Sequence, residues 1–178
     1  MTKQLFQRTL VLAALLAAVV PSTQAACNGA DLVADTPDAR FTAAADTVAD
    51  KASGLTWKRC AEGLSGADCA TGSVVTGTWA EALARVAAVN AAPATLGAGL
   101  SDWRLPNSNE LATIVERKCI NPAVNATVFP HTPGQSFWTA SPYALNAAFA
   151  WYVDFNAGDV GPAFKTGAKN IRLVRGGN

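Results

Sequence analysis

The sequence predicts an α+β domain in which an antiparallel sheet is accompanied by two helices and long loops. Two segments, starting at Thr78 and Asn107, begin with a capping box, and apolar residues at helical spacing follow each box. Several short runs alternate apolar and polar residues, as half-buried strands do, and turn residues separate these runs. A hairpin, two helices and then a run of strands, in that order, are typical of the α+β class.

Residues 1–25 have the pattern of a signal peptide. Lys3 and Arg8 precede an uncharged apolar run, Pro21 ends this run, and small residues before position 26 suit a signal peptidase. The run is short for a membrane span, and no later stretch approaches the roughly 20 apolar residues that a span needs. We therefore expect an exported chain, periplasmic or secreted, with no membrane span after signal removal.

The remaining chain, about 150 residues, is the size of one domain with a substantial core. It carries 12 basic and 13 acidic residues, because Lys3 and Arg8 lie in the signal. Such a balance argues against general nucleic-acid binding, which usually requires a basic excess. All the tryptophans lie beyond the signal, and we expect them to build a compact core: Trp57, Trp79, Trp103, Trp138 and Trp151.

The four cysteines of this exported chain favour two disulfides over free thiols or metal ligands. Three pairings are formally possible. Cys60 and Cys69 flank a glycine-containing segment that can close locally, which leaves Cys27 to pair with Cys119. The sequence contains no Cys-x-x-Cys motif, which argues against a zinc or redox site.

We interpret residues 26–49 as an N-terminal arm held by Cys27, and residues 50–178 as the folded domain. A hairpin is expected where the pattern changes, at 47–59, with a turn that ends in Gly54. Leu55 and Trp57 alternate with polar residues there, so one face of the second strand should be buried.

The first helix is expected after Thr78, which forms a capping box with Glu81. Its apolar stripe is followed by Asn90 and Pro93, which should end the helix, and residues 93–99 form a small-residue linker. The stripe consists of Trp79, Leu83, Val86 and Val89.

The second helix follows a short buried strand at 102–106, in which Trp103 and Leu105 point to the same side. Asn107 and Glu110 form its capping box. The apolar residues at 111, 114 and 115 predict about three helical turns.

A polar group within the same stretch has a structural interpretation. Asp102, Arg104 and Glu110 could form a polar site, but a buried ion pair or cap that orients the strand–helix turn explains them better. We therefore assign structural roles to Arg104, Asn107 and Glu110, and to the tryptophans at 57, 103, 138 and 151.

Beyond Cys119 the helical period does not return, and proline-containing breakers describe a long irregular segment up to Gly134. Three runs then predict strands, at 136–139, 149–155 and 170–175. The acidic sequence at 154–159 resembles the start of a calcium loop, but no glutamate closes it at position 12. A turn after the second strand is the better interpretation.

Several of these segments together resemble the C-terminal domain of the Legionella collagen-like adhesin, long regarded as a domain of unknown function. The resemblance covers about residues 50–176, and the segments stand in the order found in that family. They are Gly-Leu-Thr-Trp at 54–57, Asp-Trp-Arg-Leu-Pro-Asn at 102–107, Glu-Leu at 110–111, Phe-Pro at 129–130, Phe-Trp-Thr-Ala-Ser at 137–141, Ala-Trp-Tyr-Val-Asp-Phe at 150–155 and Arg-Leu-Val-Arg at 172–175.

The resemblance implies a variant of the C-type-lectin-like fold. In the namesake adhesin the domain is implicated in binding sulfated polysaccharides, although the collagen-like repeat that precedes it there is missing from this chain. The Trp-Arg-Leu-Pro and Arg-Leu-Val-Arg-Gly segments also look distantly similar to formylglycine-generating enzymes. Those enzymes use a cysteine pair in the C-terminal part of the domain, and no cysteine follows Cys119 here.

We expect no catalytic residue, metal site or cofactor. His131 is the only histidine, and a single histidine among prolines is a loop residue rather than part of a multi-histidine metal site. No Gly-x-Ser-x-Gly or phosphate-cradling glycine motif is present.

The candidate ligand-binding residues form a basic group near the C-terminus. They are Lys165, Lys169, Arg172 and Arg175. Arginine pairs with sulfate-like oxyanions in fork geometry, although charge that guards a strand edge explains the same group. We therefore predict a non-enzymatic binding module for anionic polysaccharide or a cell-surface partner. The alternative is an enzyme of unidentified chemistry on a formylglycine-generating-enzyme-like fold.

Overall fold

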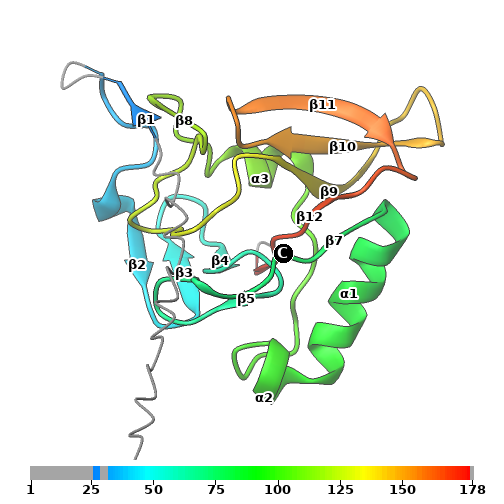
Figure 1. Cartoon of the computed structure of the whole chain (residues 1–178), viewed down its shortest axis with the longest axis horizontal. Helices are drawn as coiled ribbons and strands as arrows, with labels where there is room; N and C mark the ends of the chain where they lie inside the picture. The colour runs from blue at the N-terminus through cyan, green and yellow to red at the C-terminus, as the bar shows by residue number, and fades with distance from the viewer. Residues whose placement is uncertain (1–25, 29–31, 177–178) are drawn as a thin grey trace, which may run out of the picture.

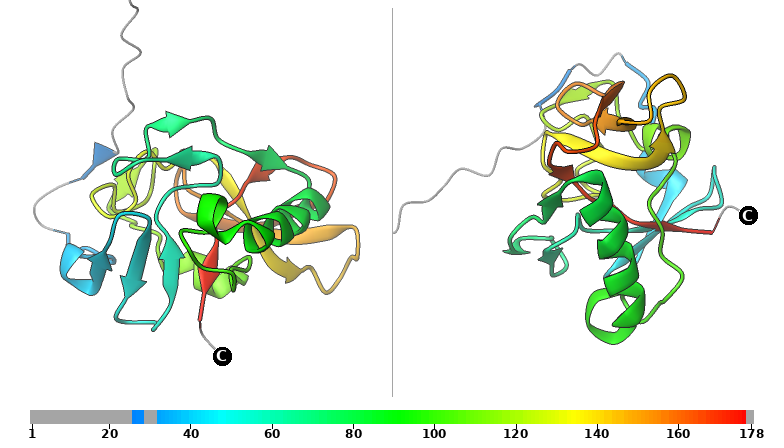
Figure 2. Two further views of the ribbon diagram at one scale, coloured as in Figure 1. Left: turned by 90° about the horizontal axis from the view of Figure 1, so that it is seen from below. Right: turned by 90° about the vertical axis from the view of Figure 1, so that its right-hand side faces the viewer.

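The computed structural model describes residues 26–28 and 32–176, so the expected signal peptide lies outside the described residues. Two larger sheets, of five and four strands, and two small two-stranded sheets are combined with short helices. Figure 1 shows the five-stranded sheet above helix α1 (Trp79–Ala91), with the four-stranded sheet to one side. Seen from below in Figure 2, α1 crosses in front of the strands. The α+β class predicted from the sequence is confirmed.

At one edge of the five-stranded sheet, the expected turn joins the edge strand to its neighbour. Asp154 lies opposite Asp159 and Phe149 opposite Phe164, so the acidic segment is a hairpin turn. One neighbouring pair is parallel, with Asn170 opposite Phe137, and the prediction of a wholly antiparallel sheet is wrong. This pair is parallel because the chain, after the edge strand at 159–164, crosses the sheet and places its next strand beside the strand at 136–142. From edge to edge the strands are β11 (Asp159–Phe164), β10 (Phe149–Asp154), β9 (Ser136–Pro142), β12 (Lys169–Asn170) and β7 (Thr76–Gly77).

The four-stranded sheet contains the predicted hairpin. Val48 lies opposite Trp57, and both side chains are completely buried. Residues 41–49, which we interpreted as part of the arm, contribute an edge strand and most of its neighbour, next to a 3-10 turn, η1 (Asp38–Arg40). In order the strands are β13 (Val174–Arg175), β4 (Thr56–Lys58), β3 (Thr47–Asp50) and β2 (Phe41–Ala43).

Helix α1 begins at the predicted capping box. The Glu81 N–H donates to the Thr78 hydroxyl at 3.3 Å, and the Thr78 N–H donates to the Glu81 carboxylate at 2.7 Å. Leu83 is 40% exposed, so its place in the predicted apolar stripe is wrong. The face toward the core runs through Trp79, Ala82, Val86 and Val89, whose spacings of three and four residues leave Leu83 at the rim. The expected linker contains a short helix, α2 (Pro93–Leu96).

Helix α3 (Ser108–Ala112) begins at the predicted cap but is much shorter than three turns. The Asn107 side chain accepts from the Glu110 N–H at 2.8 Å, which completes the capping box with the reverse bond. Ile114 and Val115 are buried after the helix has ended. Val115 pairs instead with Val124 in an isolated bridge, so the backbone there joins an extended segment rather than another helical turn.

The segment before α3 is extended and buried, as predicted, but it makes only one bridge instead of a strand. Arg104 and Val174 exchange two backbone hydrogen bonds, of 2.9 and 3.0 Å. Trp103 and Leu105, on either side of Arg104, are each 2% exposed. The bridge ties the entry to α3 to the end of the chain.

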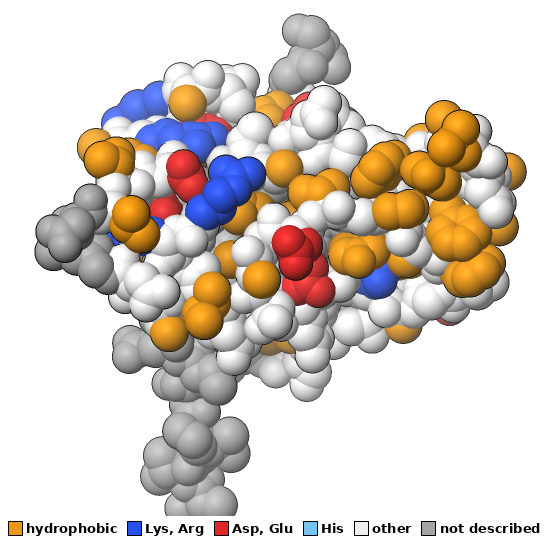
Figure 3. Space-filling model, turned by 90° about the horizontal axis from the view of Figure 1, so that it is seen from above, with side chains coloured by type: hydrophobic (Ala, Val, Ile, Leu, Met, Phe, Trp, Pro, Cys, Tyr) orange, Lys and Arg blue, Asp and Glu red, His pale blue; other side chains and the backbone are white. Residues whose placement is uncertain are grey.

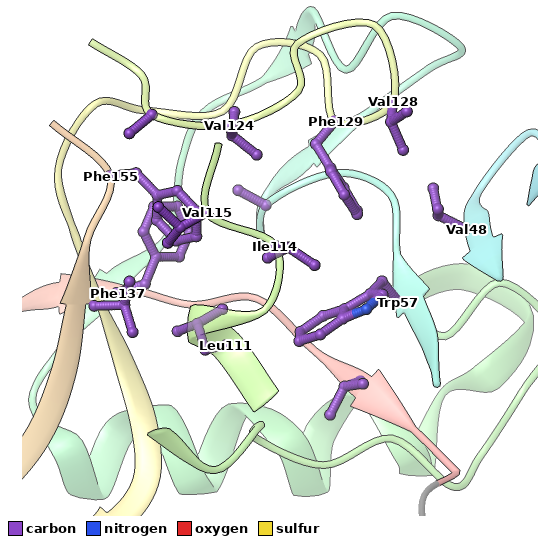
Figure 4. Packing of buried hydrophobic residues seen from close by; sticks show 14 of the residues in the cluster. Val48, Trp57, Leu111, Ile114, Val115, Val124, Val128, Phe129, Phe137 and Phe155 are labelled. Carbon is purple, nitrogen blue, oxygen red and sulfur yellow. The ribbon is translucent and has the colours of Figure 1, made fainter. Parts of the chain in front are cut away.

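Two hydrophobic clusters form the core. One lies between α1 and the five-stranded sheet and includes Trp103 and Trp138. The other joins the four-stranded sheet, α3 and the opposite side of β9 and β10. Figure 4 shows Phe137, Phe155 and Val115 packed together in this second cluster, with Trp57 below Ile114.

Both predicted disulfides are confirmed, Cys60–Cys69 and Cys27–Cys119. The first closes a local loop that contains one strand of a small hairpin, whose other strand follows Cys69, and the second links the N-terminal segment to the region after α3. The strands of the two small sheets are β5 (Leu64–Ser65) with β6 (Thr71–Gly72), and β1 (Ala26–Cys27) with β8 (Cys119–Ile120).

Candidate functional site

The four basic residues predicted to bind ligand do not form one cluster. Lys165 lies in the turn after β11 and Lys169 lies in β12, so both are at the five-stranded sheet. Arg175 lies in β13 of the other sheet. Arg172, between β12 and β13, has no exposed surface. Neighbouring positions in the sequence are therefore separated into three environments.

Arg172 cannot take part in a surface binding site, which corrects the sequence prediction. Its guanidinium donates to the carbonyl oxygens of Lys58 and Arg59 and, at 2.7 Å, to the Thr132 hydroxyl. The group also lies 4.9 Å from the ring centre of Phe129. Burial lowers the pKa of Arg172 to about 9, while the charge of Glu62 acts in the opposite direction. This arginine holds two parts of the core together.

Arg175 already has an acidic partner. Its Nε donates to the Asp102 carboxylate at 2.7 Å, and both side chains are partly exposed. The hydrogen bond from Arg175 holds the pKa of Asp102 below its usual range. Asp102 balances the charge of Arg175 one to one, so this pair has no excess positive charge to attract a ligand anion.

The two lysines lie over aromatic rings on the α1 side of the five-stranded sheet. Lys165 Nζ is 4.3 Å from the ring centre of Trp79, and Lys169 Nζ is 4.2 Å from that of Tyr152. Partial burial lowers the pKa of Lys169, and the charge of Asp154 opposes this shift. Within residues 26–28 and 32–176, neither lysine forms an ion pair. We call Trp79, Tyr152, Lys165 and Lys169 the lysine–aromatic surface.

Hydrogen bonds fix the lysine–aromatic surface from beneath. The Trp79 indole N–H donates to the Thr139 carbonyl at 2.9 Å, and the Trp79 backbone N–H donates to the Lys165 carbonyl at 2.9 Å. The Trp138 indole donates to the Gly77 carbonyl, also at 2.9 Å. The start of α1 is thus locked to β9 and to the end of β11, and the lysines project from a rigid support.

Of the polar group at 102–110, Arg104 and Glu110 form an ion pair at the strand–helix turn, whereas Asp102 pairs with Arg175. Arg104 donates two hydrogen bonds to Glu110, of 2.8 and 2.7 Å, while Glu110 also caps α3. The bonds from Arg104 lower the pKa of Glu110, and burial opposes this effect. Arg104 also donates to the Gly176 carbonyl at 2.7 Å, so the pair fastens the chain end to the helix start.

A family model described as the Lcl C-terminal domain matches residues 46–175, most of the chain. The chain belongs to the Lcl C-terminal domain family. The match contains the lysine–aromatic surface and begins just before β3, so the edge strand β2 pairs with the family domain from outside the matched residues. No curated protein matches the chain. Within the part of the chain that the structure describes, no helix is long and apolar enough to cross a membrane.

This Lcl C-terminal domain also carries an aromatic strip that the sequence interpretation missed. It consists of Tyr143, Phe149, Trp151 and Phe164. Tyr143 lies 5.4 Å from Trp151, and Phe149 lies 4.1 Å from Phe164, measured between ring centres. Strand alternation puts Phe149 and Trp151 on the opposite face of β10 from Tyr152. Figure 3 shows hydrophobic side chains gathered at the right-hand end of the molecule.

The side chains of the aromatic strip are more exposed to solvent than the tryptophans of the core. Trp151 is half-buried, whereas Trp57, Trp103 and Trp138 are buried as predicted. Phe164 is 60% exposed. Strand β11 was not predicted, because its sequence Asp-Val-Gly-Pro-Ala-Phe contains glycine and proline. The adjacent aromatic residues Trp151 and Tyr152, which a strand directs to opposite faces, were the signal that could have identified two aromatic faces.

His131 and the cysteines are further side chains with the chemistry for catalysis or metal binding. His131 is exposed in its loop, and its Nδ1 lies 2.6 Å from the Asp68 carbonyl oxygen, beside the Cys60–Cys69 disulfide. Across residues 26–28 and 32–176, no group of three or more His, Cys, Asp or Glu side chains is placed to hold a metal ion. All four cysteines are joined in disulfides.

Proposed function

We propose that this Lcl C-terminal domain is an exported binding module that holds anionic polysaccharide at the lysine–aromatic surface. The observation that carries the proposal is the pair Lys165 and Lys169, which lie over aromatic rings on one side of a sheet and form no ion pair in the described part of the chain. Two disulfides and the signal-like start of the sequence support export.

The aromatic rings favour binding in two ways. They hold the lysine side chains in place, so less side-chain entropy is lost when an anionic group arrives. The partly exposed ring of Tyr152 also offers an apolar surface for the carbon face of a sugar. Sulfate and carboxylate groups would accept hydrogen bonds from the two ammonium groups, neither of which forms an ion pair with a described residue.

The proposal places the ligand on fewer residues than the sequence suggested. Arg172 is assigned to the core and Arg175 to its pair with Asp102, which leaves two lysines. Two charges support only weak binding at a single site, so strong attachment would need several copies acting together. We also propose that the domain has a variant of the C-type-lectin-like fold. The α+β arrangement with two larger sheets supports this assignment.

Heparin-column retention of the mature protein tests this proposal. Lys165→Ala/Lys169→Ala should elute at clearly lower salt than wild type, while Lys165→Arg/Lys169→Arg should keep its retention because it keeps both charges and the ring contacts. The matched control is Lys51→Ala/Lys118→Ala, which removes the same charge away from the lysine–aromatic surface. Retention of wild type should fall as salt rises, because exposed charges are screened over about 8–10 Å at physiological ionic strength.

The comparison of Lys165→Ala/Lys169→Ala with the control Lys51→Ala/Lys118→Ala decides the outcome. Equal loss of retention in both would mean that heparin responds to net charge and not to this surface. Unchanged retention of the Lys165→Ala/Lys169→Ala variant would also contradict the proposal. Circular dichroism of each variant confirms that the fold is retained.

A further inference from the structure

A second group of charges lies around Glu62, in the loop between β4 and β5. Glu62 has no exposed surface, and its carboxylate accepts hydrogen bonds from Lys58 Nζ at 2.6 Å and from Arg85 Nε at 2.8 Å. The Glu62 backbone is fixed as well, because its N–H donates to Ile171 and its carbonyl accepts from Val75. The carboxylate is therefore held in one position, and it orients both cations.

Positive charge exceeds negative charge in this group. Lys58, Arg85 and the buried Arg172 all lie within the influence of the single Glu62 carboxylate, whose charge acts to raise the pKa of Arg172. Asp46 also lines the pocket, so the excess of one positive charge in the group is that of Arg172, which is buried behind the pocket lining. Buried or half-buried charges without a full counter-charge attract a mobile anion.

A pocket of about 270 Å³ opens beside the two cations. The disulfide loop forms one wall and helix α2 another, so the pocket combines cationic, hydroxyl and apolar groups. Its lining residues are Asp46, Lys58, Cys60, Gly63, Leu64, Ser65, Arg85, Ala94, Thr95, Leu96 and Ala98. It shares no residue with the lysine–aromatic surface.

Both cations keep hydrogen-bond donors for a ligand. Arg85 uses only its Nε toward Glu62, and its two terminal amino groups make no hydrogen bond to the described residues. Lys58 Nζ uses one donor on Glu62 and has three in all. The side chains are 12% exposed for Lys58 and 23% for Arg85, so their remaining donors are partly shielded from water. The two amino groups at the end of a guanidinium match the two oxygens of a carboxylate.

We propose that this pocket binds a small organic monocarboxylate. The carboxylate accepts from the terminal amino groups of Arg85 and from Lys58 Nζ, and the apolar part of the ligand lies against Leu64 and Leu96. Asp46 repels a second negative group, so the pocket prefers monocarboxylates to dicarboxylates. The volume suits a small molecule and not a polysaccharide chain. This site is independent of the proposed polysaccharide binding.

NMR titration of the ¹⁵N-labelled mature protein tests the assignment, with butyrate as the probe and butylamine as the control of opposite charge. Butyrate should shift the amide signals of residues 58–65 and 94–98 in a saturable way, and butylamine should not. Arg85→Lys keeps the charge beside Glu62 but loses the guanidinium fork, so affinity for butyrate should fall about tenfold.

A second pair of variants leaves the charge group intact. Ala94→Trp, at an exposed position that lines the pocket, should block it and abolish saturable binding. Ala87→Trp, at an exposed position of α1 outside the pocket, should bind butyrate like wild type. Both variants should keep wild-type heparin retention, which separates this test from that of the proposed function. Equal shifts with butyrate and butylamine, or saturable butyrate binding in the well-folded Ala94→Trp variant, would overturn the proposal.

Discussion

Replacement of Arg172 distinguishes a core residue from a binding residue. The side chain donates to two backbone carbonyls and to the Thr132 hydroxyl, and its guanidinium also lies near the rings of Phe129 and Phe137. Arg172→Met keeps an unbranched apolar chain of similar length between these rings. Arg172→Ala removes the same hydrogen bonds and leaves a cavity.

Two opposing effects set the cost of Arg172→Met. Loss of the donors leaves backbone carbonyls less well bonded, which costs about 1–3 kcal/mol for each buried group. Removal of a fully buried charge relieves a desolvation cost of several kcal/mol, and the lowered pKa of Arg172 is the sign of that cost. Glu62 remains paired with Lys58 and Arg85. We expect a net destabilisation of about 1–2 kcal/mol, against about 3–5 kcal/mol for Arg172→Ala, where the cavity is added.

Urea denaturation of both variants measures the difference, provided that the slope of the unfolding free energy against urea concentration stays constant. Heparin retention of Arg172→Met should equal that of wild type. If both variants lost less than about 0.5 kcal/mol, the side chain would lie on the surface and our placement of it would be wrong. Equal and large losses would mean that the hydrogen bonds, and not desolvation and cavity formation, dominate.

Three further predictions concern the framework. Trp103→Ala should cost about 3–5 kcal/mol in urea unfolding, and Asn107→Ala only about 1 kcal/mol, because the first removes a buried ring and the second a helix cap; equal small losses would contradict the burial of Trp103. The pKa of Glu110 is lowered in the folded state, so its contribution is present above the ordinary carboxylate pKa and is lost as pH falls through the folded value. The stability deficit of Glu110→Gln, about 1 kcal/mol at pH 6, should therefore shrink at about pH 3, and a constant deficit would argue against the ion pair. Replacement of both Cys27 and Cys119 by serine should cost up to about 4–5 kcal/mol on the chain-entropy model, because the cysteines are 92 residues apart; a change below about 1 kcal/mol in thermal or urea unfolding would show that the bond constrains the unfolded chain little.

Features that depend on a few neighbouring residues could be predicted from the sequence. Both capping boxes are present at the predicted residues, Thr78 and Asn107, because a cap is satisfied within four positions of the chain. The local pair Cys60–Cys69 followed from its short spacing, and the second disulfide followed by elimination. Family membership rested on the same kind of local signature, distributed over most of the chain.

The length of α3 could not be predicted, because apolar spacing reports burial and not backbone conformation. Ile114 and Val115 are buried at the positions that a helix would use, but α3 ends at Ala112. Val115 finds its backbone partner in Val124, nine residues along, in a segment with no clear signal of its own. Competition from this pairing is a tertiary effect that the periodicity of residues 111–115 does not contain.

The sequence by itself identified a group of four cations near the C-terminus, and the tertiary structure decided which of them belong to the candidate site. Lys165, Lys169, Arg172 and Arg175 are close in sequence, but the chain passes from one sheet to the other between them. Arg172 falls at the crossing, where carbonyl groups and aromatic rings enclose it, and Arg175 reaches Asp102, which is 73 positions away. Whether a cation faces a ligand, a carboxylate or the core depends on the partners that long-range contacts bring to it, and a local pattern of charges carries no information about those partners.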